Sequence, residues 1–159
     1  MNEAQVHLLT NHFPIIGTLI AIAVILYAFF ANNKAVANTG CTIAVAMALM
    51  SIPVFLSGEG AEHMVEDMAG TSAYFLEEHE ELGKTAFWVM LGAGLLSVVV
   101  LVINSMRSVM SRTWTGVVLL VLIATFALMA YVGYLGGKIR HIEIRDGAVT
   151  EAVESHHSD

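Results

Sequence analysis

Four apolar stretches without a single charged side chain dominate this sequence and limit what it can fold into. They run over Phe13–Ala31, Ala35–Leu56, Thr85–Ile103 and Trp114–Leu135, and each has 19–22 residues. A helix of that length, rising 1.5 Å per residue, crosses a hydrocarbon core about 30 Å thick. Because lipid offers the backbone no hydrogen-bond partner, each stretch must pair its own amides as a helix. The sequence therefore predicts an all-α membrane protein, a four-transmembrane-helix up-down bundle.

The composition of the chain agrees with this interpretation and defines its first partner, the lipid bilayer. Hydrophobic residues make up 57% of the 159 residues, and the mean hydropathy is +0.72. We predict one membrane domain over residues 1–146, followed by a loosely ordered polar tail over residues 147–159. A net charge of −7 without a basic stripe argues against a nucleic-acid partner.

The segment Ser57–Lys84, between the second and third apolar stretches, holds eight of the fourteen carboxylates. Four of its side chains follow at i, i+3, i+4 and i+7, the spacing of one helix face. These are Glu59, Glu62, His63 and Glu66. We predict that this acidic extramembrane segment is partly helical, over Ala61–Ala69, and breaks at Gly70–Ser72. The stripe is expected to pack inward over the mouth of the bundle, and a solvated acidic face is the alternative.

Each predicted helix carries one histidine near the same face of the membrane. They are His12, His63, His79 and His141, and His7 lies about one turn before His12. Histidine tolerates a membrane interface for structural reasons. Ionisable groups near membrane depth are nevertheless functional by default, so we interpret the set as a cofactor or metal site.

Two kinds of site fit these histidines. Small residues one or two turns from His79 and His141 would leave a flat slot for haem, although they would equally serve close helix packing. They are Gly83, Ala86, Gly133 and Gly137, and Arg140 could pair with a propionate. The other possibility is a zinc, iron or copper ion held by the histidines together with the carboxylates of the acidic segment. Its ligands would be His12, His63, His79, His141, Glu59, Glu62 and Glu66.

The chain resembles a family of small bacterial membrane proteins of unknown function. The likeness is carried by VHLLTNHFPI, SGEGAEHMVEDM, EEHEELG and GGKIRHIEIR, and it extends from about His7 to Arg145. The most specific part is the opening His-x-x-x-x-His-Phe-Pro-Ile, and the chain departs from the family pattern at Leu8 and His63. By residue match, the family positions are His7, His12, His79 and His141.

Members of that family occur joined to Rieske iron–sulfur or c-type cytochrome domains, which implies a redox partner of that kind. This chain has no Cys-x-x-Cys-His, so a separate protein would have to supply it. The leading hypothesis is a b-type cytochrome-like electron-transfer subunit that binds haem b and has no substrate of its own. The alternatives are a non-haem metal-binding membrane protein and a structural subunit of a membrane complex. A homo-oligomer is compatible with all three.

The distribution of charge predicts an orientation in the bacterial inner membrane. All acidic residues, both termini and the histidines lie on one side, whereas two short loops with Lys34, Arg107 and Arg112 lie on the other. Short basic loops favour the cytoplasm. The termini and the acidic segment are therefore expected in the periplasm.

Reporter fusions test this orientation. A reporter that is active only in the periplasm should be active after Asp159 and inactive when inserted near Ser108. The reverse pattern would place the histidines inside the cell.

Overall fold

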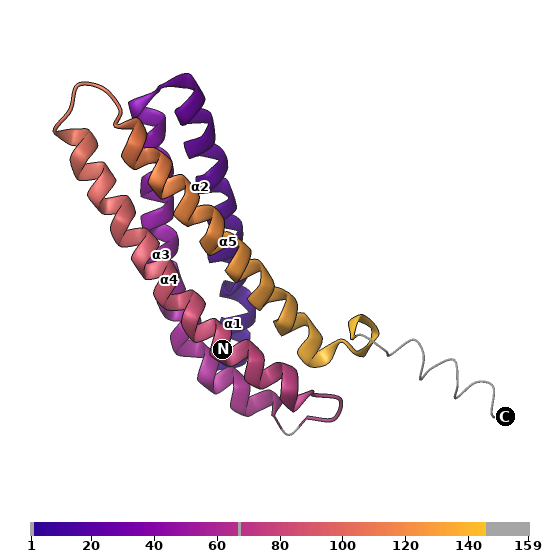
Figure 1. Cartoon of the computed structure of the whole chain (residues 1–159). Coiled ribbons are helices and arrows are strands. Elements are labelled where there is room, and N and C mark those ends of the chain that lie inside the picture. Colours follow the sequence, from indigo (N-terminus) through magenta and orange to yellow (C-terminus); the bar gives the residue numbers. More distant parts are fainter. Residues whose placement is uncertain (1, 67, 146–159) are drawn as a thin grey trace.

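The computed structural model describes residues 2–66 and 68–145, and these residues form helices and short loops without a strand. Four helical spans are long and apolar enough to cross a membrane, and the chain is an integral membrane protein built as a four-helix bundle (Figure 1). The elements are α1 Glu3–Thr10, α2 His12–Ala31, α3 Lys34–Val65, α4 Ala73–Ser105, α5 Arg112–Arg140 and the 3₁₀ helix η1 Ile142–Ile144. The predicted fold class is confirmed.

Local sequence signals set the helix ends. Pro14 lies in the first turn of α2, where its missing N–H costs no hydrogen bond. Asn32 ends α2 in the left-handed region, with φ of 50°. The next residue, Asn33, caps α3 by accepting a hydrogen bond from the amide of Val36. Two consecutive asparagines thus stop one membrane helix and start the next.

The four long helices form a closed ring in which each contacts the helix before and after it. α2 packs against α3 and α5, and α4 packs against α3 and α5, so that α2 and α4 occupy one diagonal. Short loops join the helices at one end, which we call the basic end, and there Lys34 Nζ donates to the carbonyl of Arg107 (2.8 Å). Asn104 is fully buried nearby, donating to Asn38 Oδ1 (2.9 Å) and accepting from the amide of Ser111 (3.0 Å).

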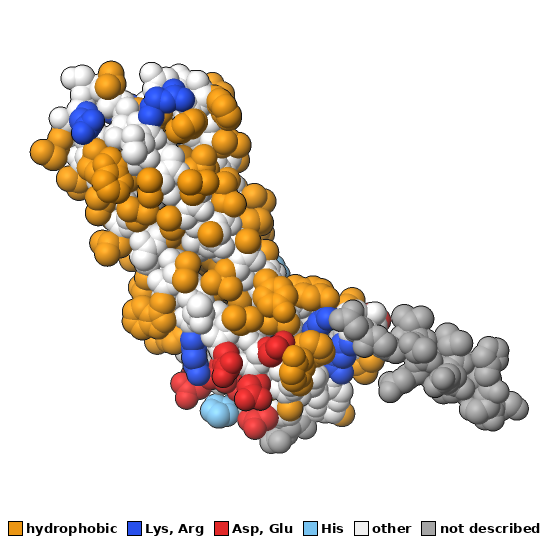
Figure 2. Space-filling view, viewed as in Figure 1, with side chains coloured by type: hydrophobic (Ala, Val, Ile, Leu, Met, Phe, Trp, Pro, Cys, Tyr) orange, Lys and Arg blue, Asp and Glu red, His pale blue; other side chains and the backbone are white. Residues whose placement is uncertain are grey.

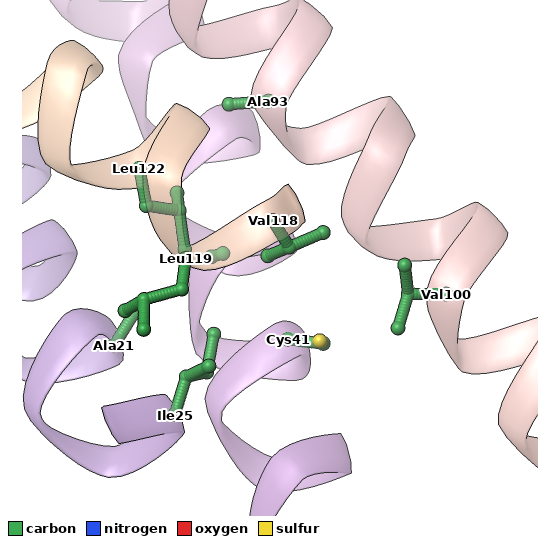
Figure 3. Close-up of a cluster of buried hydrophobic side chains, with 9 residues drawn as sticks. Ala21, Ile25, Cys41, Ala93, Val100, Val118, Leu119 and Leu122 are labelled. Atoms are coloured by element: carbon green, nitrogen blue, oxygen red, sulfur yellow. The ribbon is translucent and has the colours of Figure 1, made fainter. Parts of the chain in front are cut away.

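The core of the bundle combines branched side chains with small residues. Figure 3 shows Ile25 of α2, Cys41 of α3, Val100 of α4 and Leu122 of α5 converging in one buried cluster. Where α3 meets α4, Gly94 lies directly against the side chain of Ala48. Small residues let membrane helices approach closely, and van der Waals packing then holds them together.

We call the other end of the bundle the acidic end. There α3 and α4 continue past their apolar stretches as a helical hairpin. Figure 2 shows carboxylates gathered there, and basic side chains without carboxylates at the opposite end of the visible face. The helix predicted over Ala61–Ala69 is present over residues 61–65, where it is the continuation of α3 and not an element of its own. α3 runs unbroken from the membrane to Val65, and Asp67 is outside the described residues. The predicted break at Gly70–Ser72 is confirmed, with Gly70 at φ of 82°.

The short helix α1 was not predicted, because Glu3–Thr10 lacks the length and hydropathy of a membrane span. A capping box starts it: Asn2 Oδ1 accepts from the amide of Gln5, and Gln5 Oε1 accepts from the amide of Asn2. The helix packs mainly against α3 and brings His7 to the mouth of the bundle. The tail predicted over residues 147–159 lies outside the described residues.

Two glycines of α4 provide a matched test of this packing. A Cβ added at Gly94 would overlap the Cβ of Ala48, whereas one added at Gly92 would meet nothing within 4 Å. We expect Gly94→Ala to lower the free energy of unfolding by about 1–3 kcal/mol through overpacking. Gly92→Ala should stay within about 0.5 kcal/mol of the parent protein. Denaturation by SDS in mixed micelles measures both, and equal stability of the two variants would contradict the described α3–α4 contact.

Candidate functional site

The feature that stands out at the mouth of the bundle is a pair of histidines. The ring of His7, on α1, and the ring of His79, on α4, have centroids 6.4 Å apart and planes at 83° to each other. Both side chains are partly buried. They come from helices that are distant in sequence and meet where α1 packs against α3 at the mouth of the bundle.

Each ring is held by a hydrogen bond to a backbone carbonyl of a neighbouring helix, α3 for His7 and α5 for His79. His7 Nδ1 lies 3.0 Å from the carbonyl oxygen of Val54 on α3, and His79 Nδ1 lies 2.9 Å from that of Val132 on α5. A carbonyl oxygen can only accept, so both Nδ1 atoms carry a proton. In the neutral imidazole, Nε2 then bears a lone pair and is free to bind a metal.

The two histidines dock on their partner helices in the same way. Val54 is followed at i+4 by Gly58, and Val132 is followed at i+4 by Gly136. Side chains on a helix point toward its N-terminus, so a larger residue at i+4 would cover the carbonyl at i. A Cβ added at Gly58 would lie 3.7 Å from His7 Cε1, and one at Gly136 would lie 3.1 Å from His79 Cε1. The glycines therefore expose the carbonyls that orient the rings.

This arrangement is compatible with a pair of metal ligands. An Nδ1–H bond to a carbonyl is the usual second interaction of a metal-binding histidine, because it fixes the ring and makes Nε2 more basic. With metal–nitrogen bonds of about 2 Å and a further ~1 Å from each nitrogen to its ring centre, two imidazoles on opposite sides of one metal have centres roughly 6 Å apart. The observed spacing of 6.4 Å agrees with that value.

The structure does not bring the other predicted histidines to this pair. His63 is 71% exposed and lies 3.7 Å from Glu66 on its own helix. His141 is 62% exposed, with its Nδ1 2.8 Å from Glu143 Oε1. The pKa of the Glu143 carboxyl is lowered, first by its own backbone amide and then by the ring of His141. Both histidines have local partners at the surface.

His12 also differs from its predicted position. His12 and His79 lie near the starts of the first and third membrane helices, which usually face each other across an up-down bundle, and this predicts that the two histidines form the ligand pair. The structure places His7 against His79 instead. His12 begins α2, is exposed, and lines an apolar groove between α2 and α3. It lies five residues from His7, and five residues turn a helix by somewhat more than a third of a revolution beyond one full turn. The two side chains therefore leave different sides of the chain.

The predicted inward stripe of the acidic segment is wrong for most of its members. Glu59, His63 and Glu66 are exposed, and only Glu62 is half-buried, facing Glu80 of α4. Glu80 also pairs with Lys84 one turn further along α4. Among residues 2–66 and 68–145, no group of three or more histidine, cysteine, aspartate or glutamate side chains could hold a metal ion. The predicted His/Glu metal cluster is not assembled there.

Arg140, predicted to pair with a haem propionate, instead secures the loop between α3 and α4. Its guanidinium donates to the carbonyl of Ala69 and to Thr71 Oγ1, both at 3.2 Å. Arg145 adds a bond to the carbonyl of Gly70 (2.9 Å). Arg140 at the end of α5 and Arg145 after η1 therefore both hold this loop by hydrogen bonds.

The sequence predicted His79 as a candidate ligand and His7 as a secondary member of the histidine set. It did not identify the two glycines against which the rings pack. The missed signal was the Val-x-x-x-Gly spacing at this end of the bundle, formed by Val54 and Gly58 in α3 and by Val132 and Gly136 in α5. Such a spacing becomes informative only when a histidine is known to lie opposite it.

The fold and the histidine pair define a class: a small four-helix integral membrane protein with two oriented imidazoles at one end. No protein-family model matches the chain, and neither the curated proteins nor the solved structures contain a match to it. The resemblance described above therefore stays a prediction.

The docking of His79 on Gly136 can be tested by chemical modification. In Gly136→Ala, the new Cβ would press on the imidazole, and His79 should react with diethyl pyrocarbonate several-fold faster than in the parent protein. Gly83→Ala is the control, because its Cβ would lie 4.0 Å from Val132 in ordinary contact. Mass spectrometry of the modified peptides measures the rates, with exposed His63 as the internal reference. Unchanged protection of His79 in Gly136→Ala would contradict the described contact.

Proposed function

We propose that this protein is a b-type cytochrome-like electron-transfer subunit of the membrane, with haem b held between His7 and His79. The observation that carries the proposal is the pair itself: two imidazoles with free Nε2 atoms, each fixed by a carbonyl, at the spacing of ligands to one metal. The haem would supply a one-electron couple at this position.

The number of protein ligands favours haem over a bare ion. A structural zinc site needs four protein ligands and a catalytic one needs three. The histidine pair offers two, and the described part of the chain provides no larger group. Haem brings four nitrogen ligands of its own and needs only two axial ones from the protein. The chemistry of the donor set therefore fits haem better than zinc or non-haem iron.

The glycines beside the pair make room for the two rings. Gly58 and Gly136 carry no side chain that would displace the imidazoles from their carbonyl partners. The residues of the chain would orient the imidazoles through Val54 and Val132 and restrict access of water. Burial and these hydrogen bonds are the means by which a protein adjusts the potential of a bound haem.

The orientation and the partner belong to the same proposal. With the acidic end in the periplasm, the haem would lie near the outer face of the inner membrane. A soluble Rieske or c-type cytochrome protein could exchange electrons with it there. The carboxylates around the mouth would attract a partner with a basic surface.

Haem content in histidine variants tests the proposal. We expect the purified protein, expressed with sufficient haem, to show a Soret band and split α and β bands on reduction. His7→Asn and His79→Asn should each lower the haem content at least tenfold. The asparagine amide can still donate to the carbonyl but has no ligand at the position of Nε2.

The three exposed histidines provide the matched controls. His12→Asn, His63→Asn and His141→Asn should keep the haem content of the parent protein. Loss of haem in the His12 variant with normal content in the His7 variant would contradict the assignment. A colourless protein with stoichiometric metal would favour a non-haem site, and a protein with neither would leave the structural role.

A further inference from the structure

A second feature lies at the basic end of the bundle, opposite the histidine pair. Three cations lie in or beside the two short loops there: Lys34 at the start of α3, Arg107 after the end of α4 and Arg112 at the start of α5. The carboxylates of residues 2–66 and 68–145 all lie at the acidic end, and Figure 2 shows none at the basic end of its visible face. Within the described part of the chain, these three positive charges therefore have no carboxylate to balance them.

The cations of the two ends differ in what they contact. At the acidic end, Lys84 pairs with Glu80, and the guanidinium groups of Arg140 and Arg145 donate to backbone carbonyls. The guanidinium of Arg107 has no such partner among the described residues, where only its backbone forms hydrogen bonds. Arg107 is also exposed. Its planar fork of five N–H donors, which matches a phosphate group, is therefore available for a ligand.

Lys34 adds a second cation at the same place. Its Nζ donates to the carbonyl oxygen of Arg107 (2.8 Å), so the ammonium of one loop lies against the backbone of the other. An ammonium has three donors, and this bond leaves the others for a ligand. The loop after α4 is held in turn by buried Asn104, which accepts from the amide of Ser111 (3.0 Å). The two loops thus present a guanidinium and an ammonium together, from backbone positions that the bundle fixes.

The side chains around these cations are apolar and exposed, which is typical of a membrane surface. Met106 and Val109 of the loop expose more than two thirds of their surface, and so does Phe30 at the end of α2. Trp114, in the first turn of α5, is of a residue type enriched at the membrane–water boundary. These side chains place the loops at the level of the lipid headgroups, where the abundant anionic group is phosphate.

From these observations we propose that Lys34 and Arg107 bind the headgroup of an anionic phospholipid, with both side chains donating to its phosphate. Basic pockets between membrane helices bind anionic headgroups in this way. Phosphatidylglycerol carries a full negative charge, whereas the choline of phosphatidylcholine would bring another positive charge to a region that already has three. Arg112 packs over the ring of Phe29, 4.5 Å from its centre, and contributes charge alone. The site is independent of the histidine pair and of the function proposed for it.

Quenching of tryptophan fluorescence by brominated lipids tests this site. Met106→Trp, made in full-length protein whose Trp88 and Trp114 are both replaced by phenylalanine, places one reporter next to Arg107. Trp114→Phe alone leaves Trp88, in the outer part of α4, as the matched reporter near the acidic end. Both proteins are reconstituted in phosphatidylcholine vesicles with brominated phosphatidylglycerol or brominated phosphatidylcholine. At the Met106→Trp reporter, phosphatidylglycerol should associate about five- to tenfold more strongly than phosphatidylcholine. At Trp88, the two lipids should agree within about twofold.

Glutamine variants assign the preference to the two side chains. Arg107→Gln and Lys34→Gln keep a donor but remove the charge, and each should lower the preference about two- to fivefold, whereas Arg112→Gln should change it less than about twofold. Equal quenching by both lipids at the Met106→Trp reporter, the same preference at Trp88, or a preference that survives both glutamine substitutions would overturn the proposal. Loss of the preference on adding inorganic phosphate at constant ionic strength would assign the cations to a soluble anion and would overturn it as well.

Discussion

The constraint on which this structure depends is that lipid gives the backbone nothing to bond with. Each apolar stretch must become a helix, and polar side chains inside the bundle mostly bond back to carbonyls of their own helix. Ser97 donates to the carbonyl of Ala93 and Thr125 to that of Val121 in this way. His7 and His79 depart from this rule because each donates to a carbonyl of another helix. These two bonds tie α1 to α3 and α4 to α5 at the mouth.

Such bonds need a helix whose carbonyl is accessible from the side, and this requirement explains the glycines. A carbonyl oxygen has two lone pairs, so one can serve the helix while the other accepts from the imidazole. Gly58 and Gly136 remove the side chain that would otherwise cover Val54 and Val132. The same feature that lets the helices pack closely thus also fixes the tautomer and direction of both rings. Packing and candidate chemistry therefore depend on the same few residues.

The uncharged apolar stretches were sufficient to predict the four helices, and the turn residues were sufficient to predict the break at Gly70–Ser72. The site was predicted only in part. The position of a residue relative to the apolar stretches determines its depth in the membrane, so the histidines could be assigned to one end of the bundle. The direction of a side chain around its helix depends on partners, and Glu59 and His12 point away from the positions expected of them. The helix α1 was missed because its capping box is a local signal in a segment too short to span the membrane.

The central claim is that His7 and His79 are the two axial ligands of one haem. The electron paramagnetic resonance spectrum of the oxidised protein, prepared with haem, tests it most directly. Two imidazoles whose planes lie near 83° should give the strongly anisotropic low-spin ferric signal of near-perpendicular axial ligands. Replacing either histidine with asparagine should remove that signal. A low-spin signal that persists in His7→Asn, or a haem-supplemented protein without any low-spin signal, would contradict the account.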